Sequence, residues 1–261
     1  MIEATTELLL LLAAAAFVAG FIDAIAGGGG LITLPALLLA GLGPVEALGT
    51  NKLQAFFGSG SATFSYARKG YVDPRQQLPA FALAMMGSAL GALAASIAPG
   101  EALQAVLPLL LIAIAAYFAM KPRLSDVDRA ERLGPTLFLL TVPPAIGFYD
   151  GLFGPGTGSF FMIAYIGFAG YGVLKATAHT KVLNFASNIG AFFVFATIGA
   201  MAWKIGLVMG AAQLVGARLG SMLAMRIGSR LIKPLLILVS LALAIRLLAD
   251  PDNPIRSWLG F

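Results

Sequence analysis

The chain has 261 residues, of which 59% are hydrophobic and only 11% are charged. Soluble domains carry roughly a quarter charged residues, so this composition excludes a soluble enzyme and a soluble nucleic-acid-binding domain. The formal net charge of +5 is better explained by basic loops beside apolar spans than by a nucleic-acid partner. The absence of cysteine excludes disulfides and thiol catalysis. The composition predicts an integral membrane protein.

Six apolar stretches are long enough to cross a membrane, which takes about 20 mostly apolar residues. They are residues 43–67, 78–98, 102–120, 173–199, 203–225 and 231–249. Two further apolar stretches are interrupted by glycines. The first covers residues 8–26 and resumes over 31–42, and the second covers 135–153 and resumes over 159–169.

The resumed segments are too short to cross a bilayer. Each rises only about 17 Å as a helix, whereas the hydrocarbon core is roughly 30 Å thick. A helix broken at membrane depth is tolerated where protein buries it or where it lines a wet cavity. A turn at the protein surface is the alternative, but apolar runs on both sides of each glycine cluster favour a buried break.

The two interrupted stretches belong to an internal repeat. Residues 20–23 (Gly-Phe-Ile-Asp) match residues 147–150 (Gly-Phe-Tyr-Asp) at an offset of 127, and beyond the glycines residues 47–52 face residues 176–181 at an offset of 129. The second offset also superimposes the Gly-x-x-x-Gly pair at 87–91 on the pair at 216–220. Such small residues let membrane helices approach closely. Each half is therefore predicted to hold a broken helix pair followed by three spanning helices.

Charge placement predicts how the halves are oriented. The loops at 68–77, 121–134 and 226–233 together hold ten of the 17 lysines and arginines, and the positive-inside rule makes these loops cytoplasmic. Yet the acidic turn at 99–101 and the basic turn at 228–230 are equivalent in the repeat. We therefore expect the halves to be inverted in the membrane, with both termini extracytoplasmic.

The predicted fold is an all-α, multi-pass integral membrane protein with two inverted-topology repeats, each a glycine-interrupted (re-entrant) helix pair plus three spanning helices. Residues 1–120 form the first repeat, 121–134 a cytoplasmic connecting loop, 135–250 the second repeat and 251–261 a C-terminal tail. Inverted repeats with paired broken helices are typical of secondary transporters, whose substrate site lies near the membrane midplane.

Ionisable residues inside the spans are candidates for function, because charges there are costly. Lys52 and Lys181 each lie nine residues into a span, about 14 Å deep, where the short segments after the glycines also begin. Two cations and two helix N-termini at one depth favour an anion. Pairing of the lysines with Asp23 and Asp150, or snorkelling towards water, is the alternative.

Polar side chains accompany the lysines at helical spacing. Asn51 and Gln54 precede a run of small polar residues on one helix, and Asn184 and Asn188 follow Lys181 on its repeat partner. Such a stripe lines a wet pathway or supplies hydrogen bonds between helices, and both interpretations stay open. His179 is interpreted as a packed histidine, with a proton relay as the alternative. No cluster of metal ligands and no cofactor motif is recognised.

Three motifs resemble the sulfite exporter TauE/SafE family, namely GFIDAIAGGG at 20–29, GTNK at 49–52 and GFYDGLFGPGTG at 147–158. The resemblance covers nearly the whole chain. It implies a permease of the bacterial inner membrane for sulfur-containing anions, with the glycine turns, Asn51, Lys52, Thr180 and Lys181 as the substrate region. The second half reads His-Thr-Lys where the first reads Thr-Asn-Lys, so equal roles for the halves are not assumed.

The full set of candidate site residues combines these arguments. Expected at the substrate are Gly28, Gly29, Gly30, Asn51, Lys52, Gln54, Gly156, Thr157, Gly158, Thr180, Lys181 and Asn184. Expected to couple transport or to form charge pairs are Asp23, Asp150 and His179.

The preferred function is a secondary transporter that exports a small sulfur oxyanion or sulfonate by alternating access, with H⁺ or Na⁺ as a candidate coupling ion and a homo-oligomer as a candidate assembly. No cofactor, metal or nucleic acid is expected, and no enzyme activity. Two alternatives remain: a passive anion channel, and an intramembrane aspartyl protease in which Asp23 and Asp150 share a proton.

Overall fold

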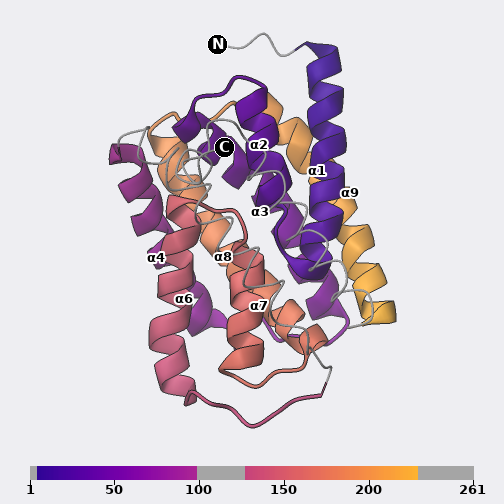
Figure 1. Ribbon diagram of the computed structural model, residues 1–261, viewed down its shortest axis with the longest axis vertical. Helices are drawn as coiled ribbons and strands as arrows, with labels where there is room; N and C mark the ends of the chain where they lie inside the picture. The colour runs from indigo at the N-terminus through magenta and orange to yellow at the C-terminus, as the bar shows by residue number, and fades with distance from the viewer. Residues whose placement is uncertain (1–4, 99–126, 229–261) are drawn as a thin grey trace, which may run out of the picture.

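The computed structural model describes residues 5–98 and 127–228. All secondary structure in these ranges is helical (Figure 1). The helices are α1 (Thr6–Ala26), α2 (Gly30–Leu39), α3 (Pro44–Arg68), α4 (Leu78–Ile97), α6 (Pro135–Leu152), α7 (Thr157–Gly167), α8 (Val173–Thr197) and α9 (Trp203–Ile227). Their ends lie within three residues of the predicted stretches. The predicted spans 102–120 and 231–249 and the tail 251–261 lie outside the described residues.

Three of the described helices, α1, α4 and α9, are long and apolar enough to cross a membrane. Helices α3 and α8 are each 25 residues long, which corresponds to about 37 Å, but polar side chains lower their hydropathy. These polar side chains are largely buried, as Gln54, Ser59, Thr177 and Ser187 illustrate. The polar stripes of α3 and α8 therefore face the interior of the protein.

Glycine and proline set the helix ends. Helix α1 ends before Gly27, and Gly27 and Gly28 have φ values of 80° and 91°. Helix α6 is followed by Gly154 and Gly156, with φ values of 88° and 84°. Positive φ is readily adopted only by glycine, so these residues fix both interruptions. Helix α6 begins with a proline at its first position, where the missing N–H costs nothing.

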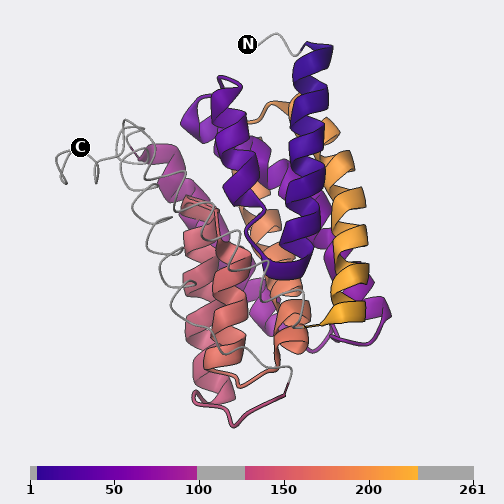
Figure 2. The same cartoon turned by 45° about the vertical axis from the view of Figure 1, so that its right-hand side comes forward.

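The helices pack in pairs that combine the two halves of the chain. Helix α1 lies along α9 and α4 lies along α6, while α3 and α8 contact each other and one of these pairs each. Figure 2 shows α1 and α9 side by side on one flank and α4 with α6 on the other. Each pair thus joins a helix of the first half to a helix of the second.

Both Gly-x-x-x-Gly pairs lie at these contacts. Gly87 and Gly91 face the backbone of α6 at Pro144 and Phe148. The equivalent glycines, 216 and 220, face the backbone of α1 at residues 17 and 21. A Cβ at any of the four positions would overlap a carbonyl oxygen. The predicted close approach at both pairs is therefore confirmed.

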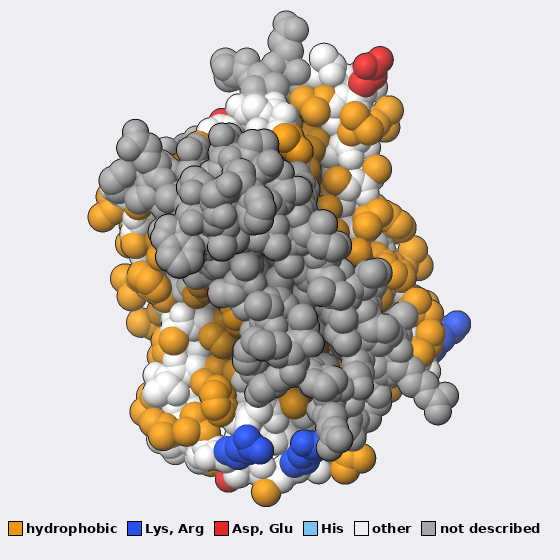
Figure 3. All heavy atoms as spheres, in the orientation of Figure 1, with side chains coloured by type: hydrophobic (Ala, Val, Ile, Leu, Met, Phe, Trp, Pro, Cys, Tyr) orange, Lys and Arg blue, Asp and Glu red, His pale blue; other side chains and the backbone are white. Residues whose placement is uncertain are grey.

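The outer surface is mainly apolar, as a lipid-facing surface requires. Leu39 is 79% exposed and Leu11 is 71% exposed, and apolar side chains cover much of the visible flanks in Figure 3. On that face the lysines and arginines gather mainly near the lower end. The segment 127–134 lies at the same end in Figure 1.

Candidate functional site

The two glycine breaks pack against each other inside the protein. A Cβ on Gly27 would lie 2.5 Å from the backbone nitrogen of Ser159, and the Ser159 hydroxyl donates to the Ala26 carbonyl over 3.1 Å. Gly30 faces Pro155 across the same contact. Residues 154–158 are all buried, so the alternative of surface turns does not describe these breaks.

An aspartate lies beside the start of each short helix. The backbone N–H of Gly29, the N-cap of α2, donates to Asp23 Oδ1 over 3.1 Å. At α7, the Thr157 hydroxyl oxygen lies 2.6 Å from Asp150 Oδ1. Carboxylates are favourable at helix N-termini, where N–H groups are unpaired. The protein's own carboxylates thus occupy part of the environment that the sequence predicted for an external anion.

Each aspartate also accepts a hydrogen bond from a lysine of the other half. Lys52 Nζ lies 2.7 Å from Asp150 Oδ1, and Lys181 Nζ lies 3.0 Å from Asp23 Oδ2. Lys181 also donates to the backbone carbonyl of Asp23. Both lysines are at most 1% exposed. The pairing alternative is therefore the arrangement observed, and it links the first half to the second twice.

Such pairs constrain the fold strongly. Removing one partner of a buried pair typically costs about 3–5 kcal/mol, because the other charge is left without compensation in a low-dielectric interior. Tyr66 adds a further link, since its hydroxyl donates to the Ala24 carbonyl over 2.9 Å. Side chains from α3 and α8 thus hold the residues at the glycine breaks in place.

The amides beside the lysines present N–H groups to the breaks. Asn51 Oδ1 accepts hydrogen bonds from the Thr33 hydroxyl at 2.6 Å and from Gln54 Nε2 at 2.8 Å. With its oxygen engaged, the Asn51 amide nitrogen lies beside Gly30. From α8, the amide nitrogen of Asn184 lies beside Gly158. These two amides, one from each half of the chain, bring N–H donors to the same region.

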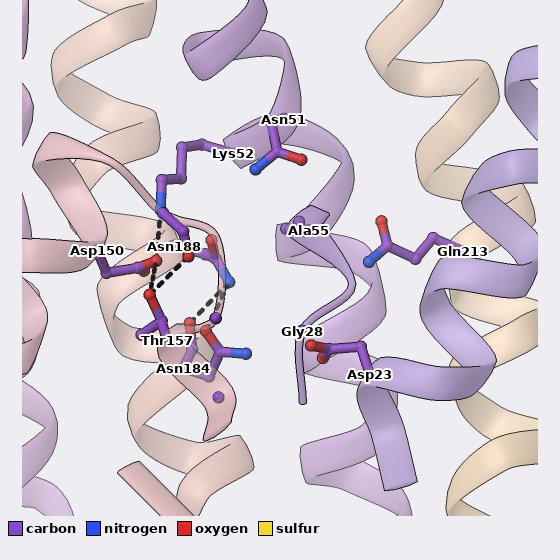
Figure 4. A pocket seen from close by; sticks show the side chains of 14 residues that line it. Asp23, Gly28, Asn51, Lys52, Ala55, Asp150, Thr157, Asn184, Asn188 and Gln213 are labelled. Atoms are coloured by element: carbon purple, nitrogen blue, oxygen red, sulfur yellow. Dashed lines mark hydrogen bonds and ion pairs between the residues drawn. The ribbon is translucent and has the colours of Figure 1, made fainter. Parts of the chain in front are cut away.

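A small polar cavity lies where these groups meet (Figure 4). Its volume is about 20 Å³, which is room for about one or two ordered waters. Of the residues singled out from the sequence, the lining includes Asp23, Gly28, Gly30, Asn51, Lys52, Asp150, Gly156, Thr157, Gly158, Asn184 and Asn188. Figure 4 shows Lys52, Asp150 and Thr157 on one side and Asp23, Asn51 and Gln213 on the other.

Comparisons with known proteins identify the family of the chain. The model of one family, Sulfite exporter TauE/SafE, matches residues 12–247. The chain belongs to this family. It is 61% identical over 254 residues to the probable membrane transporter protein ORF9 of Sinorhizobium sp, covering 97% of each chain.

Two further relatives carry similar names. The probable membrane transporter protein YfcA of Escherichia coli K12 is 44% identical over 246 residues, 94% of this chain and 91% of the relative. A probable membrane transporter protein of Haemophilus influenzae is 45% identical over 255 residues, 98% of both. No solved structure matches the chain. As a TauE/SafE protein, the chain is a multi-pass membrane transporter.

Five candidate residues of this TauE/SafE protein do not line the cavity: Gly29, Gln54, Thr180, Lys181 and His179. Gly29 donates a hydrogen bond to the cavity residue Asp23, and Gln54 donates one to the cavity residue Asn51. Thr180 is buried, and its hydroxyl has no hydrogen-bond partner among residues 5–98 and 127–228. Gly29 has a helical φ of −55°, so its backbone angle does not require glycine. A side chain at this position would instead overlap that of Asp23.

His179 lies away from the cavity, in a cluster of tyrosines. Its ring centroid is 4.8 Å from that of Tyr171 and 5.5 Å from that of Tyr165. Its Nδ1 lies 2.9 Å from the Lys175 carbonyl of the preceding helical turn. These contacts support the packed histidine rather than a relay at the cavity.

Two residues that line the cavity were not singled out, Ala55 and Gln213, and a third, Gly154, was expected only as part of the second glycine turn. Gln213 comes from α9, and its side chain fills the space that Gly20 and Gly58 leave open. Its Oε1 is buried without a partner in the described part of the chain. The sequence signal was a lone amide side chain in the span 203–225, which a search for charges passes over.

Proposed function

We propose that this TauE/SafE protein is a secondary transporter that exports small sulfur-containing anions, of the sulfite or organosulfonate class, by alternating access. The observation that carries the proposal is the buried Lys52 at a polar cavity, together with amide donors from both halves. An anion with several oxygens suits these donors, because Lys52 offers charge and the Asn51 and Asn184 amides offer N–H groups. The cavity, at about 20 Å³, is too small for such an anion, so substrate binding requires the halves to separate.

We also propose that the halves are inverted in the membrane, with re-entrant helix pairs and with both termini outside the cytoplasmic membrane of a bacterium. The directions of equivalent helices support this, since α1 begins at the upper end of Figure 1 and α6 begins at the lower end. The reciprocal contacts fit a two-fold relation between the halves, since α1 pairs with α9 as α6 pairs with α4 and each lysine meets the aspartate of the other half. Transporters of this kind bind substrate where broken helices from two repeats meet.

A carrier fits the cavity better than a passive channel. The described cavity is small, and it is lined by the ion pair of Lys52 with Asp150 and by Asp23 of the second pair. An open pore needs a continuous wet path, whereas a carrier needs a site that is closed between its two open states. The protease alternative loses its support, because Asp23 and Asp150 each accept from a lysine instead of sharing a proton.

Flux into proteoliposomes tests the proposal. The purified protein is assayed with sulfite, thiosulfate, an organosulfonate and sulfate, and protein-free liposomes serve as the control. We expect saturable flux of at least one sulfite or sulfonate substrate, with sulfate transported poorly. Absence of flux for every sulfur-containing anion would contradict the proposed function, and currents far above carrier turnover under voltage clamp would favour a channel.

A further inference from the structure

The two buried ion pairs differ in how firmly each lysine is held. Lys181 contacts both a carboxylate oxygen and the backbone carbonyl of Asp23, and it does not line the cavity. Lys52 contacts one carboxylate oxygen of Asp150, and both residues line the cavity. The second carboxylate oxygen, Asp150 Oδ2, is buried without a hydrogen-bond partner in the described ranges. The pair formed by Lys52 and Asp150 is therefore the one that a substrate can reach.

We propose that Lys52 exchanges Asp150 for the transported anion, and that Asp150 takes up one proton in the exchange, so that each singly charged anion moves together with one proton. This inference rests on the proposed function and adds the coupling ion to it. The carrier cycles between a state with the Lys52–Asp150 pair and a state with Lys52 bound to the anion beside a neutral Asp150.

Charge balance inside the protein requires the proton. Before binding, one ammonium and one carboxylate balance each other. An entering monoanion that takes Lys52 leaves the Asp150 carboxylate buried without a counter-charge, which typically costs several kcal/mol. Protonation of that carboxylate removes the unpaired charge, so the bound state is again neutral.

Thr157 provides a partner for Asp150 in both states. Its hydroxyl oxygen lies 2.6 Å from Asp150 Oδ1 and 2.7 Å from the Gly154 carbonyl. When Asp150 is ionised, the hydroxyl donates to it. When Asp150 is protonated, its O–H donates to the Thr157 oxygen, and the threonine hydrogen turns to the Gly154 carbonyl. The neutral acid is therefore not left without an acceptor.

Other titratable groups around Asp150 are already engaged or distant in the fold. From α3 only Lys52 contacts it, and α4 carries no titratable side chain. From α8, Lys181 is held by Asp23 of α1. On its own helix, the Tyr149 hydroxyl donates to the Pro155 carbonyl over 2.6 Å. On α7, the Tyr165 hydroxyl donates to Gln77.

On the loading side, a hydronium ion transfers its proton to a carboxylate oxygen of Asp150, forming an O–H bond and releasing water. On the opposite side, that O–H bond breaks, water accepts the proton, and the anion leaves Lys52. The Lys52–Asp150 pair then re-forms, and no oxidation or reduction takes place.

The experiment uses methanesulfonate as substrate, because this anion stays ionised across the working pH range and carries no proton itself. Proteoliposomes contain a pH-sensitive dye, and a K⁺ ionophore clamps the membrane potential. We expect one proton to enter with each methanesulfonate and the rate to be independent of the clamped potential. An imposed pH gradient at zero potential should accumulate the anion, a measurement that needs no variant.

The Asp150→Asn variant should transport methanesulfonate without protons and become sensitive to potential, whereas Asp128→Asn, at the surface, should keep proton coupling. Methanesulfonate flux of the unaltered protein without proton movement, or without accumulation on a pH gradient, would overturn this inference while leaving the proposed function intact. Proton-coupled flux that persists in folded Asp150→Asn would also overturn it. No flux of any sulfur-containing anion would instead contradict the proposed function.

Discussion

The hydroxyl of Ser159 donates to the backbone carbonyl of Ala26 over 3.1 Å, which ties the start of α7 to the end of α1. These residues come from different halves of the chain, and both are next to a glycine break. Gly27 packs against this contact, because a side chain in its place would overlap the backbone of Ser159. The two breaks therefore form one structural unit at the centre of the protein.

Gly27→Ala tests this unit. Gly27 has φ 80° and ψ 174°, a region essentially restricted to glycine, in which another residue costs about 1–3 kcal/mol. The added Cβ would also overlap Ser159. We expect loss of thermal stability in detergent and loss of flux. Gly70→Ala is the control, because Gly70 also has positive φ (76°) but open space around it, and similar losses in both variants would contradict the packing argument.

Gly91→Ala tests the close approach of α4 and α6. Its Cβ would overlap the Phe148 carbonyl, and overpacking of this kind typically costs about 1–3 kcal/mol. The melting temperature in detergent should fall. Gly167→Ala, a helical glycine with nothing within 4 Å of the new Cβ, should leave it unchanged or raise it. Equal melting temperatures for both variants would show that the Gly91 contact tolerates separation.

The helices and their breaks could be predicted because their signals are local: apolar length, glycine clusters and a repeat. The partners of the lysines could not. Which aspartate meets Lys52 depends on how the halves pack, and the sequence spacing fits several pairings. Gln213 was missed for a related reason, since the glycines that make room for it lie on α1 and α3.

Asp128 ties the connecting segment to the start of α8. Its carboxylate accepts from Lys175 Nζ at 2.7 Å and from the Gly172 N–H at 2.6 Å, and the hydrogen bond from Lys175, followed by that from Gly172, lowers the pKa of Asp128. Because the folded pKa lies below the unfolded one, this stabilisation is present above the unfolded pKa and is lost as pH falls through the folded pKa.

Asp128→Asn should therefore loosen this segment at neutral pH. The backbone N–H groups of Arg129 and Arg132 donate to Gly170 and Phe168, so their loss exposes two trypsin sites. We expect faster tryptic cleavage after these arginines, with flux retained. Glu131→Gln, at an exposed neighbour, should cleave at the wild-type rate. Unchanged cleavage in Asp128→Asn would mean that the backbone bonds suffice.

Single cysteines test the inverted topology in this cysteine-free chain. Lys69 and Ile198 are equivalent in the repeat, and each is an exposed residue that caps the end of its helix, α3 or α8. We expect Ile198→Cys to react with an impermeant thiol reagent in intact cells, and Lys69→Cys to react only after permeabilisation. Labelling of both from the same side would contradict inversion, and the unaltered chain is the control for background.

Substitution of the two buried lysines, Lys181 and Lys52, should have different effects. Lys181 is held by two atoms of Asp23 and does not itself line the cavity, so Lys181→Met leaves a buried carboxylate unpaired, at a typical cost of about 3–5 kcal/mol. We expect little folded protein, measured as the monodisperse fraction after detergent extraction. The double variant Lys181→Met with Asp23→Asn should restore that fraction, and a normal yield of Lys181→Met alone would contradict the structural role.

Lys52→Met should instead act mainly on substrate affinity, because Asp150 can be neutralised by a proton beside Thr157. Loss of a buried charge partner for the anion typically costs about 2–5 kcal/mol, which is roughly 30- to several-thousand-fold in the half-saturating concentration. Lys52→Gln keeps an N–H donor and should lie between Met and the unaltered protein. Adding Asp150→Asn to Lys52→Met should improve the folded yield but not the affinity, because the cation that binds the anion is still missing. Unchanged half-saturation in Lys52→Met would remove Lys52 from the substrate site.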